Sequence, residues 1–204
     1  SATATTANIA ANGRKSGSQS EEANIPPVLL KGTNASNILR VTKGDVGFAH
    51  FEADSGHLAT LHVGPDQSAV VRLGDGVDLT NAALTQSGGT LTVDSTTSSG
   101  TIVMTAGVMN IISAAHAAIT VRGGQLNYSG AGTITTLTIR QGGNVIFSSD
   151  LARTVTNVEL FEGFAVHDLA NTLTVTNGYD FNECNPKSGD FDIGTNLTLT
   201  PSAI

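Results

Sequence analysis

The densest group of side chains that could do chemistry lies near residue 155. It contains three carboxylates and one guanidinium, those of Asp150, Glu159, Glu162 and Arg153. Paired carboxylates with a basic neighbour are the groups that cleave glycosidic bonds, one as acid and the other as base or nucleophile. Such sites also need aromatic side chains to hold the sugar, and aromatic residues make up only 4% of this chain. The sequence therefore predicts a protein that is not an enzyme, and no catalytic residue is assigned.

The side chains that could hold a metal ion have no spacing typical of a metal site. The pair His57 and His62 belongs to no HExxH arrangement, and no ligand spacing recurs among the five histidines. The segment DFNECNPKSGDFD is similar to a calcium loop, but it lacks the central glycine and the closing glutamate of an EF-hand. Its acidic residues are Asp180, Glu183, Asp190 and Asp192. We therefore expect exposed strand histidines, a solvated loop, and neither a metal nor another cofactor.

Composition and charge exclude two classes of partner. The 204 residues carry a net charge of -7 and only ten scattered lysines and arginines, too few to neutralise nucleic-acid phosphates. No apolar run approaches the about 18 residues that a membrane span needs. The single cysteine, Cys184, excludes an intrachain disulfide and is expected to be a small buried apolar residue. The N-terminal residues lack the apolar block of a signal peptide, which predicts an intracellular start.

The elements that position these side chains are predicted to be repeats. Glycines recur at intervals of 15 to 20 residues, each between two short apolar alternations, as in LTIRQGGNVIF at 137–147. The six glycines predicted to form the corners of the repeats are Gly89, Gly107, Gly124, Gly143, Gly163 and Gly178. A repeat of this length indicates a solenoid, in which each coil packs only against its neighbours.

Apolar and polar residues alternate on both sides of each turn. In the copy around Gly107, Ile102 and Met104 come before the turn, and Met109 and Ile111 come after it. Strict alternation places one set of side chains on one face of a strand. We therefore expect these pairs to point into a narrow core.

Three copies depart from this pattern. The first has a polar residue, Gln86, where the others have an apolar one. The fifth weakens after its turn to Ala165 and His167, and the sixth has no apolar pair after its turn. The loss in the sixth copy is expected at an end of the array.

We predict an all-β fold, a single-stranded β-solenoid (β-helix) of irregular coils of about 18 residues. Stacking the coils at about 4.8 Å places like residues above one another, with Leu, Ile and Val inside and Thr outside. The low aromatic content fits so thin a core. An ordinary β-sandwich with glycine-rich turns is the alternative, and the handedness of the solenoid stays open.

The remaining segments are arranged around the solenoid, which is predicted for residues 76–178. Residues 1–24 have almost no apolar periodicity and predict a flexible N-terminal arm that becomes ordered on a partner. Residues 25–75 predict a β cap or irregular first coils, and residues 179–204 a C-terminal cap with a last strand. Caps are expected because exposed strand edges invite further pairing.

Three segments, ITTLTIRQGGNVIFSSDLARTVTNVELFEG, LANTLTVTNGYDF and NLTLTPSAI, resemble proteins encoded near the major capsid gene of tailed bacteriophages. The resemblance covers roughly residues 28–204, and the order of residues 142–157 is its most distinctive part. It implies a β-solenoid virion protein of the head decoration or cement type. That family has no catalytic residues to carry over.

The resemblance also implies partners and a location. The protein is expected to be made in the host cytoplasm, to bind the major capsid protein of the same phage on the capsid surface, and to stabilise the head. A homo-oligomer is expected, with a trimer as the symmetry implied by such assemblies. The residues expected to bind the shell are Arg14, Lys15, Ile25, Pro26 and Pro27.

Two other functions are alternatives. A tail fibre or tailspike segment would share the solenoid and bind host glycans, but it would need surface aromatic residues. The only tyrosines are Tyr128, at a predicted inward position, and Tyr179. Thr-Leu-Thr triplets beginning at Thr90, Thr136, Thr172 and Thr198 resemble the arrays of ice-binding solenoids. Threonine is also a common outward residue of ordinary strands.

Overall fold

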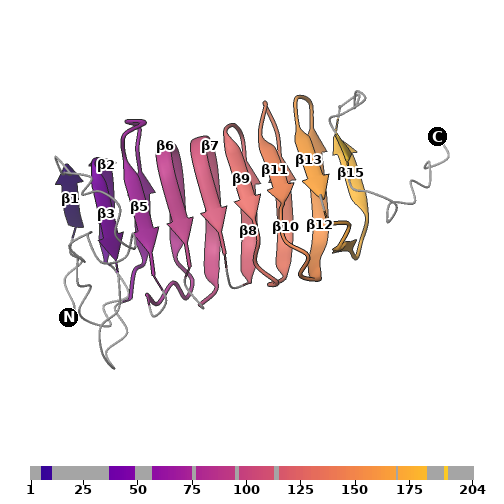
Figure 1. The fold of residues 1–204 in the computed structure, drawn as a ribbon, viewed down its shortest axis with the longest axis horizontal. Helices are drawn as coiled ribbons and strands as arrows, with labels where there is room; N and C mark the ends of the chain where they lie inside the picture. Colours follow the sequence, from indigo (N-terminus) through magenta and orange to yellow (C-terminus); the bar gives the residue numbers. More distant parts are fainter. Residues whose placement is uncertain are drawn as a thin grey trace.

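The fold is seen in a computed structural model, which describes residues 6–10, 37–48, 57–74, 77–94, 97–112, 115–168, 170–182 and 191–192. Every secondary-structure element within these residues is a β-strand, and the strands pair in parallel. The strands stack in successive coils along the long axis of the molecule (Figure 1).

Each coil contributes one segment to each of two faces. The first face contains β1 (Thr6–Ala10), β2 (Ile38–Lys43), β4 (Thr60–Val63), β8 (His116–Val121), β10 (Ile134–Ile139), β12 (Arg153–Phe161), β14 (Leu173–Val175) and β15 (Tyr179–Asn182). The second face contains β3 (Asp45–Phe48), β5 (Val70–Leu73), β9 (Gln125–Tyr128), β11 (Asn144–Phe147), β13 (Ala165–Asp168) and β16 (Phe191–Asp192). The long strands β6 (Ala83–Val93) and β7 (Ser99–Ile111) run through both faces.

Like residues stack on one another because the register is kept from coil to coil. On the first face Leu84 pairs with Ile102, Ile102 with Ile119, and Ile119 with Leu137. The predicted β-solenoid is therefore confirmed, and the predicted ladder of aliphatic residues runs along its interior. An ordinary β-sandwich is excluded, since sandwiches are built from antiparallel strands.

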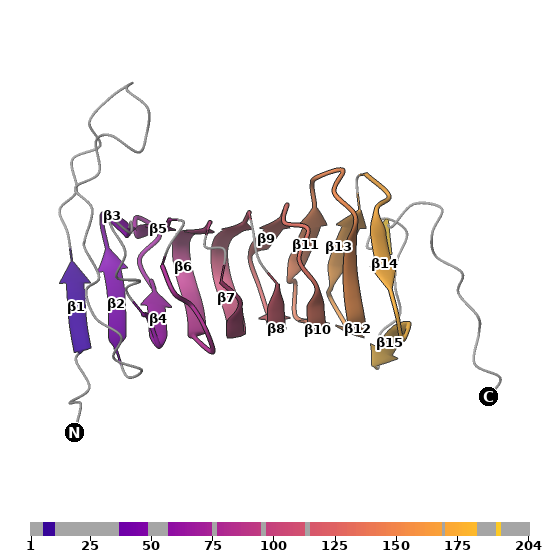
Figure 2. The same cartoon turned by 90° about the horizontal axis from the view of Figure 1, so that it is seen from below.

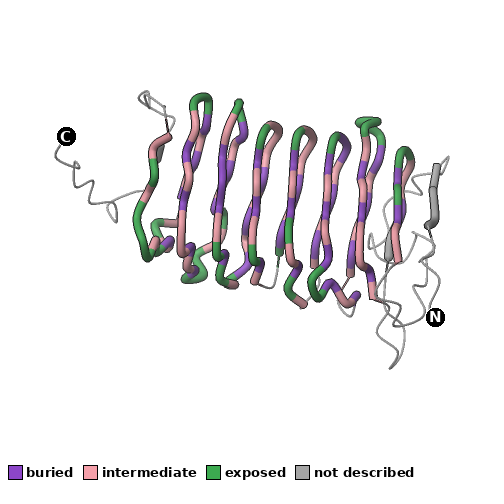
Figure 3. Tube along the Cα trace, turned by 180° about the vertical axis from the view of Figure 1, so that it is seen from behind, coloured by how far each residue is buried: buried purple, intermediate pink, exposed green. Residues whose placement is uncertain are grey.

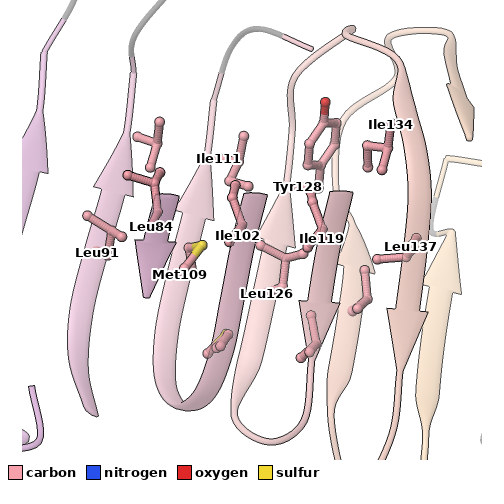
Figure 4. Close-up of a cluster of buried hydrophobic side chains, with 14 of the residues drawn as sticks. Leu84, Leu91, Ile102, Met109, Ile111, Ile119, Leu126, Tyr128, Ile134 and Leu137 are labelled. Atoms are coloured by element: carbon pink, nitrogen blue, oxygen red, sulfur yellow. The ribbon is translucent and has the colours of Figure 1, made fainter. Parts of the chain in front are cut away.

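The core lies between the two faces, which Figure 2 shows as two layers viewed from below. Buried residues alternate with partly exposed ones along the strands, and exposed residues recur at the turns (Figure 3). Leu91, Met109, Ile111 and Leu126 are fully buried, together with Tyr128, whose predicted inward position is confirmed (Figure 4). The core is a continuous strip of mostly Leu, Ile and Val.

One predicted pair of inward residues is wrong. In β13 the buried residues are Val166 and Asp168, which lie in register with Val145 and Phe147, whereas Ala165 and His167 are on the outer side. The reason is that Gly163 stacks in line with Gly142 rather than with Gly143, so the alternation after the corner is displaced by one residue.

The ends of the array only partly overlap the described residues. Strand β1, within the predicted arm, pairs in parallel with β2. Strands β2 to β5, within the predicted cap, continue both faces of the solenoid. Residues 1–5, 11–36, 183–190 and 193–204 lie outside the described residues.

Candidate functional site

The buried polar side chains of the later coils gather inside the solenoid, where the second face returns to the first. Five of them form what we call the internal polar cluster: Ser99, His116, Tyr128, Arg153 and Asp168. Three coils supply them: β7 begins at Ser99, β8 begins at His116 and β9 ends at Tyr128, and β12 begins at Arg153 and β13 ends at Asp168. It is the largest collection of chemically active side chains within the described residues.

The Arg153 guanidinium is at the centre of the internal polar cluster and is held by main-chain oxygens. Its Nη1 donates to the carbonyl of Tyr128 at 2.7 Å, and its Nε and Nη2 donate to the carbonyl of Leu151 at 3.1 and 3.0 Å. Nη2 also donates to the carbonyl and the hydroxyl of Ser149, both at 2.5 Å. The side chain is therefore a fixed strut that closes the turn between two coils.

Aromatic rings cover the two flanks of this guanidinium. Its carbon lies 5.5 Å from the ring centroid of Phe147 and 6.0 Å from that of Tyr128, within the range of a cation–π contact. The Tyr128 ring meets the Phe147 ring edge-on at 5.8 Å and the His116 ring edge-on at 6.2 Å. The hydroxyl of Ser99 lies 2.7 Å from Nδ1 of His116. The rings continue the aliphatic core into its polar end.

Burial governs the electrostatics of the internal polar cluster. Desolvation lowers the pKa of Arg153, while the charges of Asp168, Tyr128 and Asp150 oppose that change. Desolvation raises the pKa of Tyr128 to about 12, and the charge of Arg153 acts in the opposite direction. Both groups therefore keep their protons at neutral pH, Arg153 as a cation and Tyr128 as a neutral phenol.

Asp168 supplies the negative charge of the internal polar cluster. Its Oδ2 accepts a hydrogen bond of 2.8 Å from the backbone N–H of Leu173, which anchors the next coil. Its Oδ1 is buried and has no hydrogen-bond partner among the described residues. The carboxylate and Arg153 interact through charge without a direct ion pair.

The carboxylates that the sequence places around Arg153 do not converge on it. Asp150 and Glu162 are exposed, in the turn before β12 and at the corner after it. Glu159 points outward from the first face, where it accepts a hydrogen bond of 2.9 Å from the hydroxyl of Thr138. Arg153 alone of the four is inside, at 3% exposure. The sequence did not predict that His116 and Asp168 lie in the interior. The available signal for Asp168 was its position two residues after the apolar Val166, which places both side chains on the same side of the strand.

The histidine pair also separates. Nδ1 of His57 lies 3.0 Å from Oδ2 of Asp78 in the turns beside the strands, whereas His62 points outward from β4 and contacts the Thr85 hydroxyl through Nδ1. Burial lowers the pKa of His62, with a further contribution from the charge of Arg40. Within the described ranges, no three His, Cys, Asp or Glu side chains converge on a point where they could hold a metal ion.

The predicted corner glycines do not all occupy the same place. Gly89, Gly107 and Gly124 stack on one another with positive φ angles of 67°, 91° and 78°. In the next two coils the positive φ belongs to Gly142 and Gly163, and Gly143 packs beside the carbonyl of Val121. Gly178 is not at this corner. It lies on the first face between β14 and β15, where the register with β12 changes from Val155 opposite Val175 to Val158 opposite Tyr179.

Several predicted residues cannot be placed. The expected shell-binding residues and Cys184 lie outside the described residues, as do Glu183 and Asp190. Asp180 points outward from β15. Three Thr-Leu-Thr triplets fall within the described residues, and they lie in different ladders: Thr90 is on the second face, Thr136 is on the first, and Thr172 precedes β14 at the end of the coil. The described triplets therefore do not make one flat array.

Comparison with protein-family models, curated proteins and solved structures finds no match to this chain. Among the residues that the structure describes, no helix is long and apolar enough to cross a membrane.

Proposed function

We propose that this protein is a non-enzymatic structural protein of a phage virion, a decoration or cement protein that binds the outer surface of the head. The observation that carries the proposal is the placement of its chemically active side chains. Arg153 and Asp168 point into the solenoid and bond to its own main chain, where they hold coils together. The function is therefore assigned to the outer faces and the shape of the rod.

The outer faces suit a role in holding a partner's surface. Their central positions carry short or β-branched side chains such as Thr85, Val103 and Thr120, which give a flat surface with little side-chain entropy to lose on binding. Amide side chains link neighbouring coils on the second face, where Asn127 donates to Asn110 at 2.9 Å. Parallel strands paired on both sides also resist local opening, which a protein on an exposed shell requires.

The resemblance carried by residues 134–163 supports the same proposal and names the partner, the major capsid protein. The proposed attachment uses residues 1–24 and the segment Ile25–Pro27, with the solenoid lying across the shell or projecting from it. Net charge supports it as well, because a chain of charge -7 would not bind nucleic acid before assembly.

Quantitative mass spectrometry of purified particles from the source tests the proposal. A copy number close to that of the major shell protein is expected for a decoration or cement protein. A few copies per particle would replace it with a tail fibre or vertex appendage. Complete absence of the chain from particles would overturn any role in a virion.

Binding of the purified chain to empty shells tests the attachment separately. Deletion of residues 1–24 should abolish binding. It also removes β1 from its pairing with β2, so the melting temperature is measured in parallel and should fall only slightly. A truncated chain that binds as well as the full one would contradict the assignment of attachment to that segment.

A further inference from the structure

From β2 to β15, a single ladder of outward side chains runs along the first face, and its charges are arranged asymmetrically; β1 continues the backbone register beyond Arg40. Each member lies in register with the next, and we call the set the outer ladder: Arg40, His62, Thr85, Val103, Thr120, Thr138, Glu159 and Asp180. One end carries the cation Arg40 followed by His62, and the other end carries the carboxylates Glu159 and Asp180. The four positions between them are neutral.

The outer ladder is complementary to itself when its order is reversed. Against an inverted second copy, Arg40 faces Asp180, His62 faces Glu159, and Thr85 faces Thr138. Val103 then faces Thr120 across the two-fold axis, and each contact occurs twice. Neither Arg40 nor Asp180 forms an ion pair with another described residue of its own chain, and both are exposed. Nδ1 of His62 contacts Thr85, which leaves Nε2 to face an opposing carboxylate.

We propose that the first face pairs with the first face of a second copy of this chain, with the coil order reversed and a two-fold axis parallel to the strands. The opposite arrangement, with the coils in the same order, would set Arg40 against Arg40 and Asp180 against Asp180. Like charges placed directly opposite one another oppose such docking. The reversed order is thus selected by charge, and the neutral centre allows close approach.

The remaining cations of the first face are compatible with this pairing. Arg122 and Arg140 lie beside the rungs of Thr120 and Thr138, toward the glycine corner, and Arg140 packs over the Phe161 ring at 3.9 Å. In the reversed pairing, the rung of Thr120 faces that of Val103, so Arg122 lies opposite Thr105. The rung of Thr138 faces that of Thr85, so Arg140 lies opposite Ser87. No like charges are brought together.

The size of the face sets the strength of the association. Seven steps of about 4.8 Å and strands of four to six residues give a surface of roughly 34 Å by 17 Å, or about 600 Å² per copy. Standard stable interfaces use about 800 Å² per partner. We therefore expect a weak, concentration-dependent dimer. The pairing does not depend on the proposed function, and it differs from the trimer that the phage resemblance implies.

Analytical ultracentrifugation of the full chain at increasing concentration tests the pairing. Arg40→Glu and Asp180→Lys should each raise the dimer dissociation constant by about tenfold or more, because each converts two attractive contacts into repulsive ones. The double variant, and an equimolar mixture of the two single variants, should recover wild-type affinity. Glu162→Lys makes the same charge change at an exposed corner away from the ladder and should leave the affinity unchanged.

Cross-linking tests the orientation of the two copies. In a Cys184→Ser background, Thr60→Cys should cross-link to Asn157→Cys only when the two variants are mixed, because reversed order brings these two rungs together. The two copies of position 60 would then be about 24 Å apart. A chain that stays monomeric, a trimer, a dimer insensitive to Arg40→Glu, or a disulfide between two Thr60→Cys chains would each overturn the proposal.

Discussion

The Nη1 atom of Arg153 donates a 2.7 Å hydrogen bond to the backbone carbonyl of Tyr128, 25 residues earlier in the chain. The bond spans the interior of the solenoid and reaches past the intervening coil that holds Phe147. A buried guanidinium on main-chain oxygens thus links one coil to the coil two positions before it.

Arg153→Met should destabilise the solenoid, although the new side chain is apolar and similar in length. It removes the guanidinium donors from the carbonyls of Tyr128 and Ser149, which keep the Ser148 N–H at 3.1 Å and the Thr172 hydroxyl at 3.4 Å, respectively. It also leaves the buried Asp168 carboxylate without a nearby cation. We expect the free energy of unfolding to fall by about 3 kcal/mol. Thermal unfolding should then show a midpoint lower by roughly 6–12 °C. Arg122→Met, at an exposed position, is the control and should change stability by less than about 0.5 kcal/mol. If the two variants lost the same stability, Arg153 would not be a structural strut.

Comparing Gly107→Ala with Gly178→Ala distinguishes the cost of a clash between stacked coils from the cost of backbone strain. Both glycines have nearly the same positive φ, 91° and 93°. A Cβ at Gly107 would lie 2.4 Å from the carbonyl oxygen of Gly89 in the neighbouring coil, whereas a Cβ at Gly178 meets nothing within 4 Å. In urea unfolding we expect a loss of about 1 kcal/mol for Gly178→Ala. Gly107→Ala should lose at least about 3 kcal/mol or fail to fold. Similar losses at the two positions would show that coil stacking does not limit this corner.

Gln86→Met tests the polar exception in the core. The Gln86 amide is buried, and its Nε2 donates to the carbonyls of Gly89 and Val108, both at 2.9 Å. Methionine increases apolar burial but removes the buried amide donor to these corner carbonyls, so we expect a loss of about 1–3 kcal/mol. Leu84→Met, a volume-conserving change in the same strand, should cost less than about 1.5 kcal/mol. A Gln86→Met chain more stable than wild type would contradict the capping role.

Alkaline unfolding should follow the tyrosines. Burial raises the pKa of Tyr128 to about 12, and burial followed by the charge of Asp168 also raises that of Tyr179. A raised pKa in the folded state gives stability that is complete below the unfolded value near 10 and is lost as pH rises toward 12. The Tyr128 contribution to be lost is roughly 3 kcal/mol.

Ultraviolet absorbance measures this directly, because the chain has two tyrosines and no tryptophan. Phenolate absorbance should be low at pH 10–11 in the folded protein and appear together with unfolding. In Tyr128→Phe the stability should decline less steeply above pH 10. Full tyrosine ionisation at pH 10.5 with the fold intact would contradict the buried placement of these rings.

The alternation of residues predicts most of the fold, because a strand with one buried face must repeat every two residues. It correctly places Ile102, Met104, Leu126 and Tyr128 in the core. It is wrong at β13. The prediction aligned Gly163 with Gly143, but Gly163 stacks on Gly142, one position earlier in the chain. The corners differ in length: the inward residues around them are Met104 and Met109 in one coil but Ile139 and Val145 in another.

The candidate site was much less predictable. Residues near one another in the sequence, such as Asp150, Arg153 and Glu159, diverge, because alternate residues of a strand point to opposite sides. His116 comes from a different coil than Arg153, and Asp168 comes from the opposite face of the same coil, so no local pattern marks their convergence. The complementarity of Arg40 and Asp180 depends in the same way on a register that extends over the whole solenoid.

The sequence by itself determined the parallel coiled architecture and the aliphatic interior. These properties follow from the alternation of apolar and polar residues and from the spacing of the glycines, which are local features of the chain. The tertiary structure decided which residues share a rung, that Arg153 is a strut inside the core, and that the outer ladder has one basic and one acidic end. Those properties depend on the lengths of the corners, since one added residue reverses which side chains face inward.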